Sequence, residues 1–292
     1  MYKLGKVQDR TTPLYPFRHR DGKYFTSPDV DKWDSIFNWG YRYPEMPWGL
    51  VDKKDKDELQ KYVSRRVIDL YGPEDLKMYP VVPKEAVEAA NKMSELANGV
   101  GGGTSYLEGN YHITPGSYPK FNLNALHRRE WLVNIQIENF AVDGSFFVHI
   151  FLGDFSPNPV YWTQDGNLVG THSVFSSAVG KTGCENCLQD KKNNAVVSGG
   201  VSLTRALVQK GLRDLEPERV IPYLKENLHW RVQMASGDYT KNQDIKSLVV
   251  TVAATIVESP EDPAALPIWG VPQVFDSITQ DKAGGYDKNA SL

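Results

Sequence analysis

Beyond about residue 128, apolar and polar positions alternate along the chain with a period of two. In 131–138 the odd-numbered residues are tryptophan, valine and isoleucine, and the even-numbered residues are mostly polar, which predicts a half-buried strand. Asp143 followed by Gly144 predicts a hairpin turn. Further strands are predicted at 145–152, 160–162, 195–203, 228–234 and 248–257.

The first third of the chain follows a helical period instead. Apolar residues recur every three or four positions in 57–70 and again in 83–98. Ser27 followed by Pro28 predicts the start of a short helix, and one further helical turn is predicted at 218–226.

These periods predict a mainly β protein, because several strands joined by short turns form antiparallel sheets. The expected fold is an antiparallel β-sandwich or barrel with a small helical N-terminal lead-in. We expect a proline- and aromatic-rich helical lead-in over 1–103 packed on the body, a β-sandwich domain over 104–270 and a tail over 271–292.

The composition excludes several classes of partner. A net charge of -3 and a pI near 6.1 provide no basic field for nucleic acid or an anionic membrane. No apolar run has the length of a signal-peptide core or a membrane span. Two cysteines do not form a secreted disulfide framework. We therefore expect a soluble, cytoplasmic protein with no nucleic-acid or membrane partner.

Cys184 and Cys187 are the two cysteines, and they form a C-x-x-C pair. The short spacing suits half of a tetrahedral zinc or Cu(I) site. Structural thiols and redox chemistry are the alternatives, and the loop-like sequence that follows the pair disfavours redox chemistry. His149 and His229 on predicted strands are candidate further ligands, with His172 as the alternative imidazole.

Polar residues on the predicted strands form a second candidate site. Glu130 and Gln136 occupy the polar side of one strand, and His149 and His229 lie on two others. If these strands are neighbours, one sheet face carries carboxylates, amides and imidazoles together. An ordinary solvated face is the alternative. The sequence contains neither the G-x-S-x-G motif of a nucleophile elbow nor paired H-x-x-x-H histidines.

Several short phrases occur in a specific order: TPLYPFR (12–18), WGYRYPE (39–45), REW (129–131), SFFVH (145–149), FLGDF (151–155), HSVF (172–175), CENC (184–187) and LHWRVQ (228–233). The first two resemble the segment that follows the second copper-binding helix pair of fungal tyrosinases. The others resemble the C-terminal shielding domain of those enzymes. The resemblance implies a β-sandwich that covers a copper site. It also implies that Phe175 is the aromatic placeholder in the substrate pocket and that Cys184 and Cys187 take part in copper delivery.

The two copper-binding helix pairs of those enzymes have no counterpart in the sequence, so we do not expect oxidase activity. A free-standing chain of this kind resembles the hemocyanin-like cyclopenases of fungal quinolone alkaloid pathways. That resemblance implies a zinc-containing enzyme. It would contract a cyclopenin-type 6,7-bicyclic benzodiazepine alkaloid to a viridicatin-type 6,6-bicyclic quinolone, with loss of methyl isocyanate.

On this interpretation we expect zinc to be held by Cys184, Cys187, His149 and His229, acid/base chemistry to come from Glu130, and substrate contacts to come from Phe175, His172 and Gln136. The alternative is a non-catalytic shielding domain or copper chaperone that acts on a separate oxidase chain. A remnant of a truncated tyrosinase is a further alternative.

Overall fold

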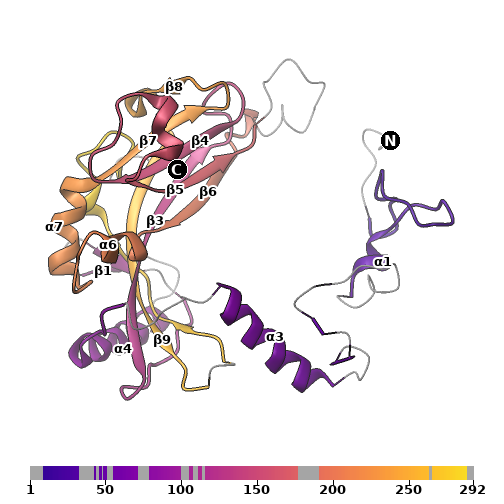
Figure 1. The fold of residues 1–292 in the computed structure, drawn as a ribbon, viewed down its shortest axis with the longest axis horizontal. Helices are drawn as coiled ribbons and strands as arrows, with labels where there is room; N and C mark the ends of the chain where they lie inside the picture. The colour runs from indigo at the N-terminus through magenta and orange to yellow at the C-terminus, as the bar shows by residue number, and fades with distance from the viewer. Residues whose placement is uncertain are drawn as a thin grey trace. The chain divides into compact units, whose positions relative to one another are not determined.

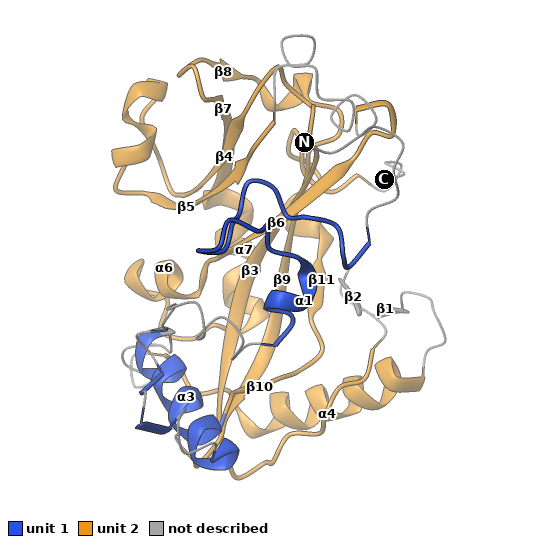
Figure 2. Cartoon of the chain, turned by 90° about the vertical axis from the view of Figure 1, so that its right-hand side faces the viewer, with its two compact units in different colours: residues 1–74, 263–265 blue, residues 75–262, 266–292 orange. Residues whose placement is uncertain are grey.

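The computed structural model describes residues 9–32, 43, 46–47, 49–50, 55–71, 79–99, 105–107, 111–113, 116–176, 191–262 and 265–287. The chain forms two compact units, 1–74 with 263–265 and 75–262 with 266–292 (Figure 2). The division falls at residue 74, whereas we expected the lead-in to extend to residue 103.

The first unit includes the helices α1 (Ser27–Val30) and α3 (Lys56–Tyr71). Helix α1 begins with a capping box, in which the carboxylate of Asp29 accepts a hydrogen bond of 2.8 Å from the backbone N–H of Thr26. Both helices were expected from the sequence, and their positions are confirmed.

The second unit contains two antiparallel sheets (Figure 1). The larger sheet has the strand order β1 (Ser105–Leu107), β2 (Tyr111–Ile113), β11 (Gln273–Phe275), β9 (Val249–Ser259), β3 (Leu126–Glu138) and β6 (Val196–Ser202), and β10 (Ile268–Trp269) pairs with β9. The smaller sheet has the order β5 (Leu168–Val174), β4 (Phe146–Leu152), β7 (Leu228–Met234) and β8 (Tyr239–Thr240). The prediction of a mainly β, antiparallel fold is confirmed.

Short helices accompany these sheets: α4 (Lys84–Gly99), α6 (Thr204–Gln209), α7 (Pro217–Asn227) and the 3-10 helices η3 (Pro159–Gln164), η4 (Asn242–Asp244) and η5 (Asp276–Ile278). Helices α4 and α7 occupy the ranges that the helical periods predicted. None of the described helices combines the length and the apolar character that a membrane crossing needs.

The core lies between the two sheets and is built from alternate residues of their strands. On β3 the odd-numbered residues from Trp131 to Ile137 are fully buried, and on β4 the even-numbered residues from Phe146 to Leu152 are fully buried. Burying each large apolar side chain contributes about 1.5–3 kcal/mol. The ring of Trp131 also stacks on Phe275, and its indole N–H donates to the carbonyl of Leu215 at 2.9 Å.

The prediction of a strand at 160–162 is wrong, because this segment forms the 3-10 helix η3. Pro159 occupies the first turn, and the side chain of Asn158 caps the helix by accepting a hydrogen bond from the N–H of Val160. Trp162 is buried and its indole N–H donates to the carbonyl of Ser156 at 2.8 Å. Local capping and this anchored ring therefore override the β propensity of the segment.

We expected a tail over 271–292. The described part of this stretch instead belongs to the large sheet and to the core. Strand β11 pairs with β2 and β9, and the following helix η5 packs into the core. Val271, Phe275 and Ile278 are buried there, because each covers apolar surface of the large sheet or its helices. The segment is an integral part of the second unit.

Helix α4 is joined to the segment before β3 by two asparagines on one face, seven residues apart. The amide of Asn91 accepts from the N–H of Phe121 at 2.7 Å and donates to its carbonyl at 3.2 Å. Asn98 makes the same pair of bonds with Tyr118, at 2.7 Å and 3.0 Å. The first pair is partly buried, and the second is exposed.

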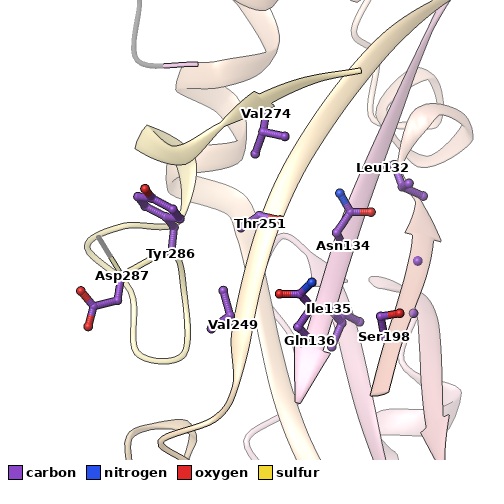
Figure 3. A pocket seen from close by; sticks show the side chains of 12 residues that line it. Leu132, Asn134, Ile135, Gln136, Ser198, Val249, Thr251, Val274, Tyr286 and Asp287 are labelled. Atoms are coloured by element: carbon purple, nitrogen blue, oxygen red, sulfur yellow. The ribbon is translucent and has the colours of Figure 1, made fainter. Parts of the chain in front are cut away.

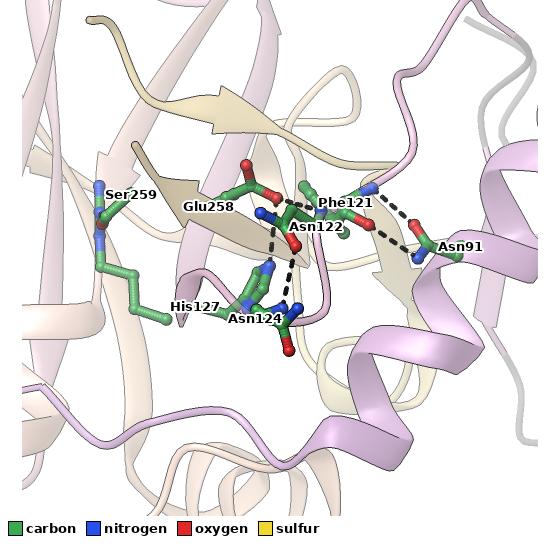
Figure 4. A network of polar contacts seen from close by, with 8 residues as sticks. Asn91, Phe121, Asn122, Asn124, His127, Glu258 and Ser259 are labelled. Carbon is green, nitrogen blue, oxygen red and sulfur yellow. Dashed lines mark hydrogen bonds and ion pairs between the residues drawn. The ribbon is translucent and has the colours of Figure 1, made fainter. Parts of the chain in front are cut away.

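A buried histidine–carboxylate contact lies next to this junction (Figure 4). Nε2 of His127 is 3.3 Å from Oε2 of Glu258, and the same oxygen accepts from the N–H of Asn122 at 2.6 Å. The ring of Phe121 meets His127 edge to face. These contacts tie the segment before β3 to the end of β9.

We expect replacement of Asn91 by Ala to lower the free energy of unfolding by about 1–3 kcal/mol, because it leaves the backbone polar groups of Phe121 without partners. Asn98→Ala is the matched control. This substitution should lower the free energy of unfolding by less, because water replaces the amide at the exposed Tyr118 site. Urea unfolding of both variants measures the difference, and equal losses would contradict this account.

Candidate functional site

The polar strand residues do not form one face, because the strands that carry them belong to different sheets. Glu130 and Gln136 lie on β3 in the larger sheet, whereas His149 and His229 lie on β4 and β7 in the smaller sheet. The core occupies the space between the sheets, so the polar positions of each sheet point away from those of the other. The condition for a combined polar face is not met.

Gln136 lines a hollow of about 690 Å³ on the outer face of the larger sheet (Figure 3). Asn134 and Thr251 contribute further polar groups from β3 and β9, and Tyr286 and Asp287 border the hollow from the C-terminal segment. Its polar side chains are neutral amides and hydroxyls, apart from the carboxylate of Asp287. This surface therefore suits hydrogen bonding better than acid/base chemistry.

Glu130 lies outside that hollow, and both of its carboxylate oxygens have protein partners. Oε1 accepts from Nε of Arg128 at 2.7 Å, and Oε2 accepts from the hydroxyl of Thr204 at 2.7 Å. The same hydroxyl accepts from the N–H of Trp131 at 2.8 Å. Glu130 thereby links β3 to the first residue of α6, and its acid/base role stays a prediction.

His149 is buried on the outer side of the smaller sheet, and both ring nitrogens have partners. Nε2 lies 3.0 Å from Oε1 of Gln233, and Nδ1 lies 2.8 Å from the hydroxyl of Thr171. The Gln233 amide nitrogen already donates to the carbonyls of Pro159 and Gly237, so its oxygen is the acceptor for His149. The network assigns the proton to Nε2, with Nδ1 accepting from Thr171.

His229 is a diagonal neighbour of His149 on the same sheet face, because the register pairs His149 with Arg231 and Phe151 with His229. The ring of His229 lies beside that of Phe155, with 5.8 Å between the ring centres. It makes no hydrogen bond within the described part of the chain, so a nitrogen is free to bind a metal ion or a ligand.

Two of the four predicted zinc ligands, Cys184 and Cys187, lie outside the described residues. The network around His149 fits a metal poorly, because a metal ion would have to displace Thr171 from Nδ1. Within the described ranges, no three His, Cys, Asp or Glu side chains gather as a metal site would require. The zinc site stays a prediction.

His172 lies where the edge strands β5 and β6 of the two sheets meet. Its ring rests against Gly199, and a Cβ atom at that position would overlap the ring. Gly170 faces Val201 in the same way, with a Cβ at 2.7 Å from the valine methyl. Nε2 of His172 is buried and has no hydrogen-bond partner in the described structure. His172 therefore packs this junction, and its predicted substrate contact is untested.

Phe175 directly follows β5, and 84% of its surface is exposed. The next residue is anchored: the N–H of Ser176 donates to the hydroxyl of Ser145 at 3.1 Å, and that hydroxyl donates to the carbonyl of Ser176 at 3.0 Å. The aromatic ring is thus held at a fixed strand end and presented to the surroundings.

Burial lowers the pKa of His149, His172 and His229 below the ordinary value of 6.5. At His229 the charges of Lys282 and Arg231 add to this effect, and Asp154 opposes it. At His149 the hydrogen bond with Gln233 opposes the effect of burial. The folded protein therefore binds protons at these sites less readily than the unfolded chain does.

We expect stability to be highest above about pH 6.5 and to fall as the pH drops below it, because protons then bind preferentially to the unfolded chain. The stability that these three histidines contribute should be fully lost once the pH is below their lowered pKa values in the folded protein. Urea unfolding from about pH 7.5 to about pH 5.5 measures it. His229→Asn should give a shallower profile, and an unchanged profile in that variant would contradict the assignment for His229.

Residues 130–252 match the family model described as the tyrosinase C-terminal domain. A tyrosinase of Neurospora crassa is 29% identical over 350 residues, which cover 97% of this chain and 50% of that protein. A tyrosinase of Podospora anserina is 27% identical over 232 residues, which cover 70% of this chain and 38% of that protein. The chain thus spans half the length of the first relative and less of the second.

Two solved structures of mushroom tyrosinase resemble the fold. One aligns with a TM-score of 0.53 at 19% identity, covering 92% of this chain and 42% of that chain. The other, which contains the latent and active forms, aligns with a TM-score of 0.51 at 22% identity. It covers 89% of this chain and 39% of that chain. At these identities the likeness concerns the fold alone. The chain is therefore related to tyrosinases, and its residues 130–252 match their C-terminal domain.

Proposed function

We propose that this protein is the covering domain of a tyrosinase-type copper oxidase and that it places the ring of Phe175 in the oxidase's substrate pocket. The observation that carries the proposal is the exposed Phe175 at an anchored strand end within the matched residues 130–252. This function corresponds to the non-catalytic alternative of the sequence analysis, and the tyrosinase relatives support it better than they support ring contraction.

The chemistry of the phenylalanine side chain suits this role. Its ring has the shape of a phenol without the oxygen, so it occupies a phenol pocket but offers no hydroxyl for oxidation. Moving the ring from water into such a pocket stabilises the complex by about 1.5–3 kcal/mol. The paired hydrogen bonds between Ser145 and Ser176 hold the strand end before binding, which lowers the entropy lost on association.

We expect the purified protein to inhibit phenol oxidation when it is added to the copper-loaded catalytic domain of the Neurospora crassa tyrosinase. Phe175→Ala should weaken the inhibition about tenfold or more, because the inserted ring is lost. Initial rates at several phenol concentrations measure the effect, which should be competitive with phenol.

Tyr161→Ala is the control for this experiment, because Tyr161 is another exposed aromatic residue, at 57% exposure, on η3. It should inhibit like the unaltered protein. Equal inhibition by the unaltered protein and the Phe175→Ala variant would refute the insertion of Phe175. Absence of inhibition by the unaltered protein would count against the covering function.

We further propose that Cys184 and Cys187 bind a soft metal ion, either Zn²⁺ or the Cu⁺ of a delivery step, since two thiolates two residues apart supply half of a tetrahedral site. Cys184→Ser is expected to remove the bound metal, as measured by elemental analysis and by competition with a Cu(I) chelator. Stoichiometric metal in that variant would show that the site lies elsewhere.

Zinc-dependent ring contraction is a separate proposal that rests on the resemblance to cyclopenases alone. The same purified protein should then convert cyclopenin to viridicatin, and Glu130→Gln should reduce the conversion. A metal-loaded sample that leaves cyclopenin unchanged would refute the activity without affecting the covering function.

A further inference from the structure

A cleft of about 490 Å³ lies on the outer side of the smaller sheet, away from Phe175 in the sequence and outside the hollow of the larger sheet. Its walls come from β7, β8, η3, η4, the segment that follows β4 and Ala283. The residues that give it chemical character are Phe155, Trp162, Arg231, Tyr239 and Lys241.

Arg231 on β7 is half-buried and lines this cleft. Its guanidinium carbon lies 4.8 Å from the centre of the Phe155 ring, and Nη1 donates to the carbonyl of Trp230 at 2.7 Å. Across the described residues no carboxylate forms an ion pair with it. Its Nε and Nη2 groups have no protein acceptor there, although partly buried cations are normally paired.

The surroundings add positive charge and aromatic surface. Lys241 lines the same cleft, and the described residues that line it include no aspartate or glutamate. The ring of Tyr239 meets the ring of Trp162 edge to face, with 5.7 Å between their centres. An anion in the cleft would therefore meet two cations, and an attached ring would meet two aromatic side chains.

Hydrogen bonds fix the walls before any ligand binds. The amide of Gln233 donates to the carbonyl of Pro159 at 3.2 Å and to that of Gly237 at 3.1 Å, which holds η3 and the turn between β7 and β8 in place. Asn242 donates to the carbonyl of Trp230 at 2.9 Å and so holds η4 beside β7. A preorganised cleft loses little entropy on binding.

We propose that this cleft binds a small aromatic carboxylate, with the carboxylate on the Nε–Nη2 edge of Arg231 and the ring against Trp162 and Tyr239. A guanidinium edge matches the two oxygens of a carboxylate, which gives the strong paired geometry of a charge-assisted contact. The volume falls within the range of about 300–1,000 Å³ that is usual for small-ligand sites.

Phenylacetate is the probe that tests this site, together with phenylacetamide and cyclohexylacetate as matched analogues. Calorimetry or NMR titration of the whole chain should show phenylacetate binding at least about tenfold more tightly than phenylacetamide, because only the carboxylate pairs with the guanidinium. Cyclohexylacetate should bind more weakly than phenylacetate, because it lacks the aromatic ring.

Variants locate the site. Arg231→Gln should weaken phenylacetate binding at least about tenfold and leave phenylacetamide binding unchanged. Lys241→Gln should have a smaller effect, since Lys241 is exposed. Arg219→Gln is the control, because Arg219 is an exposed arginine on α7. The Arg219→Gln and Phe175→Ala variants should both bind phenylacetate as tightly as the unaltered protein does.

Three results would overturn the proposal: no phenylacetate binding at millimolar concentration, equal affinity for phenylacetate and phenylacetamide, or undiminished affinity in Arg231→Gln. If Arg231→Gln fails to fold, the comparison of the three probes on the unaltered protein still decides. The covering function is independent of this site, because it depends on Phe175 and on oxidase inhibition.

Discussion

The structure depends on the shared core between the two sheets, in which alternate side chains of β3 are buried in one cluster with alternate side chains of β4 and β7. This burial determines which residues of every strand point outward, because neighbouring residues on a strand point to opposite sides. A shift of one residue in register would turn the tryptophan and isoleucine side chains toward water. The polar positions consequently appear on two separate outer faces.

The same constraint explains the glycines at the edge where β5 and β6 meet. These strands belong to different sheets and approach closely without backbone pairing. Gly170 leaves space for Val201, and Gly199 leaves space for the ring of His172. The sequence suggested His172 as a metal ligand or a substrate contact, and the structure shows that its ring packs against Gly199. Any chemistry at His172 would have to use a ring whose Nε2 is buried.

The two outer regions of the smaller sheet have different properties. Phe175 is a single exposed ring at an anchored strand end, which suits insertion into a partner's pocket. The cleft around Arg231 is concave and contains a cation without a carboxylate partner among the described residues, which suits a small anion. His149 and Gln233 serve the cleft indirectly, because their hydrogen bonds hold its walls.

The amino-acid sequence by itself determined the class of fold and the position of most elements. The period of two in 131–138 and the helical period in 83–98 are local properties, and they are unaffected by the partners that each element later meets. The tertiary structure alone decided which strands are neighbours, since pairing joins residues far apart in the chain. It placed Gln136 and His149 on opposite sides of the core, made β11 part of the large sheet and turned the segment after Asn158 into η3. Burial and long-range packing outweigh local propensity at these positions, and a local pattern contains no information about them.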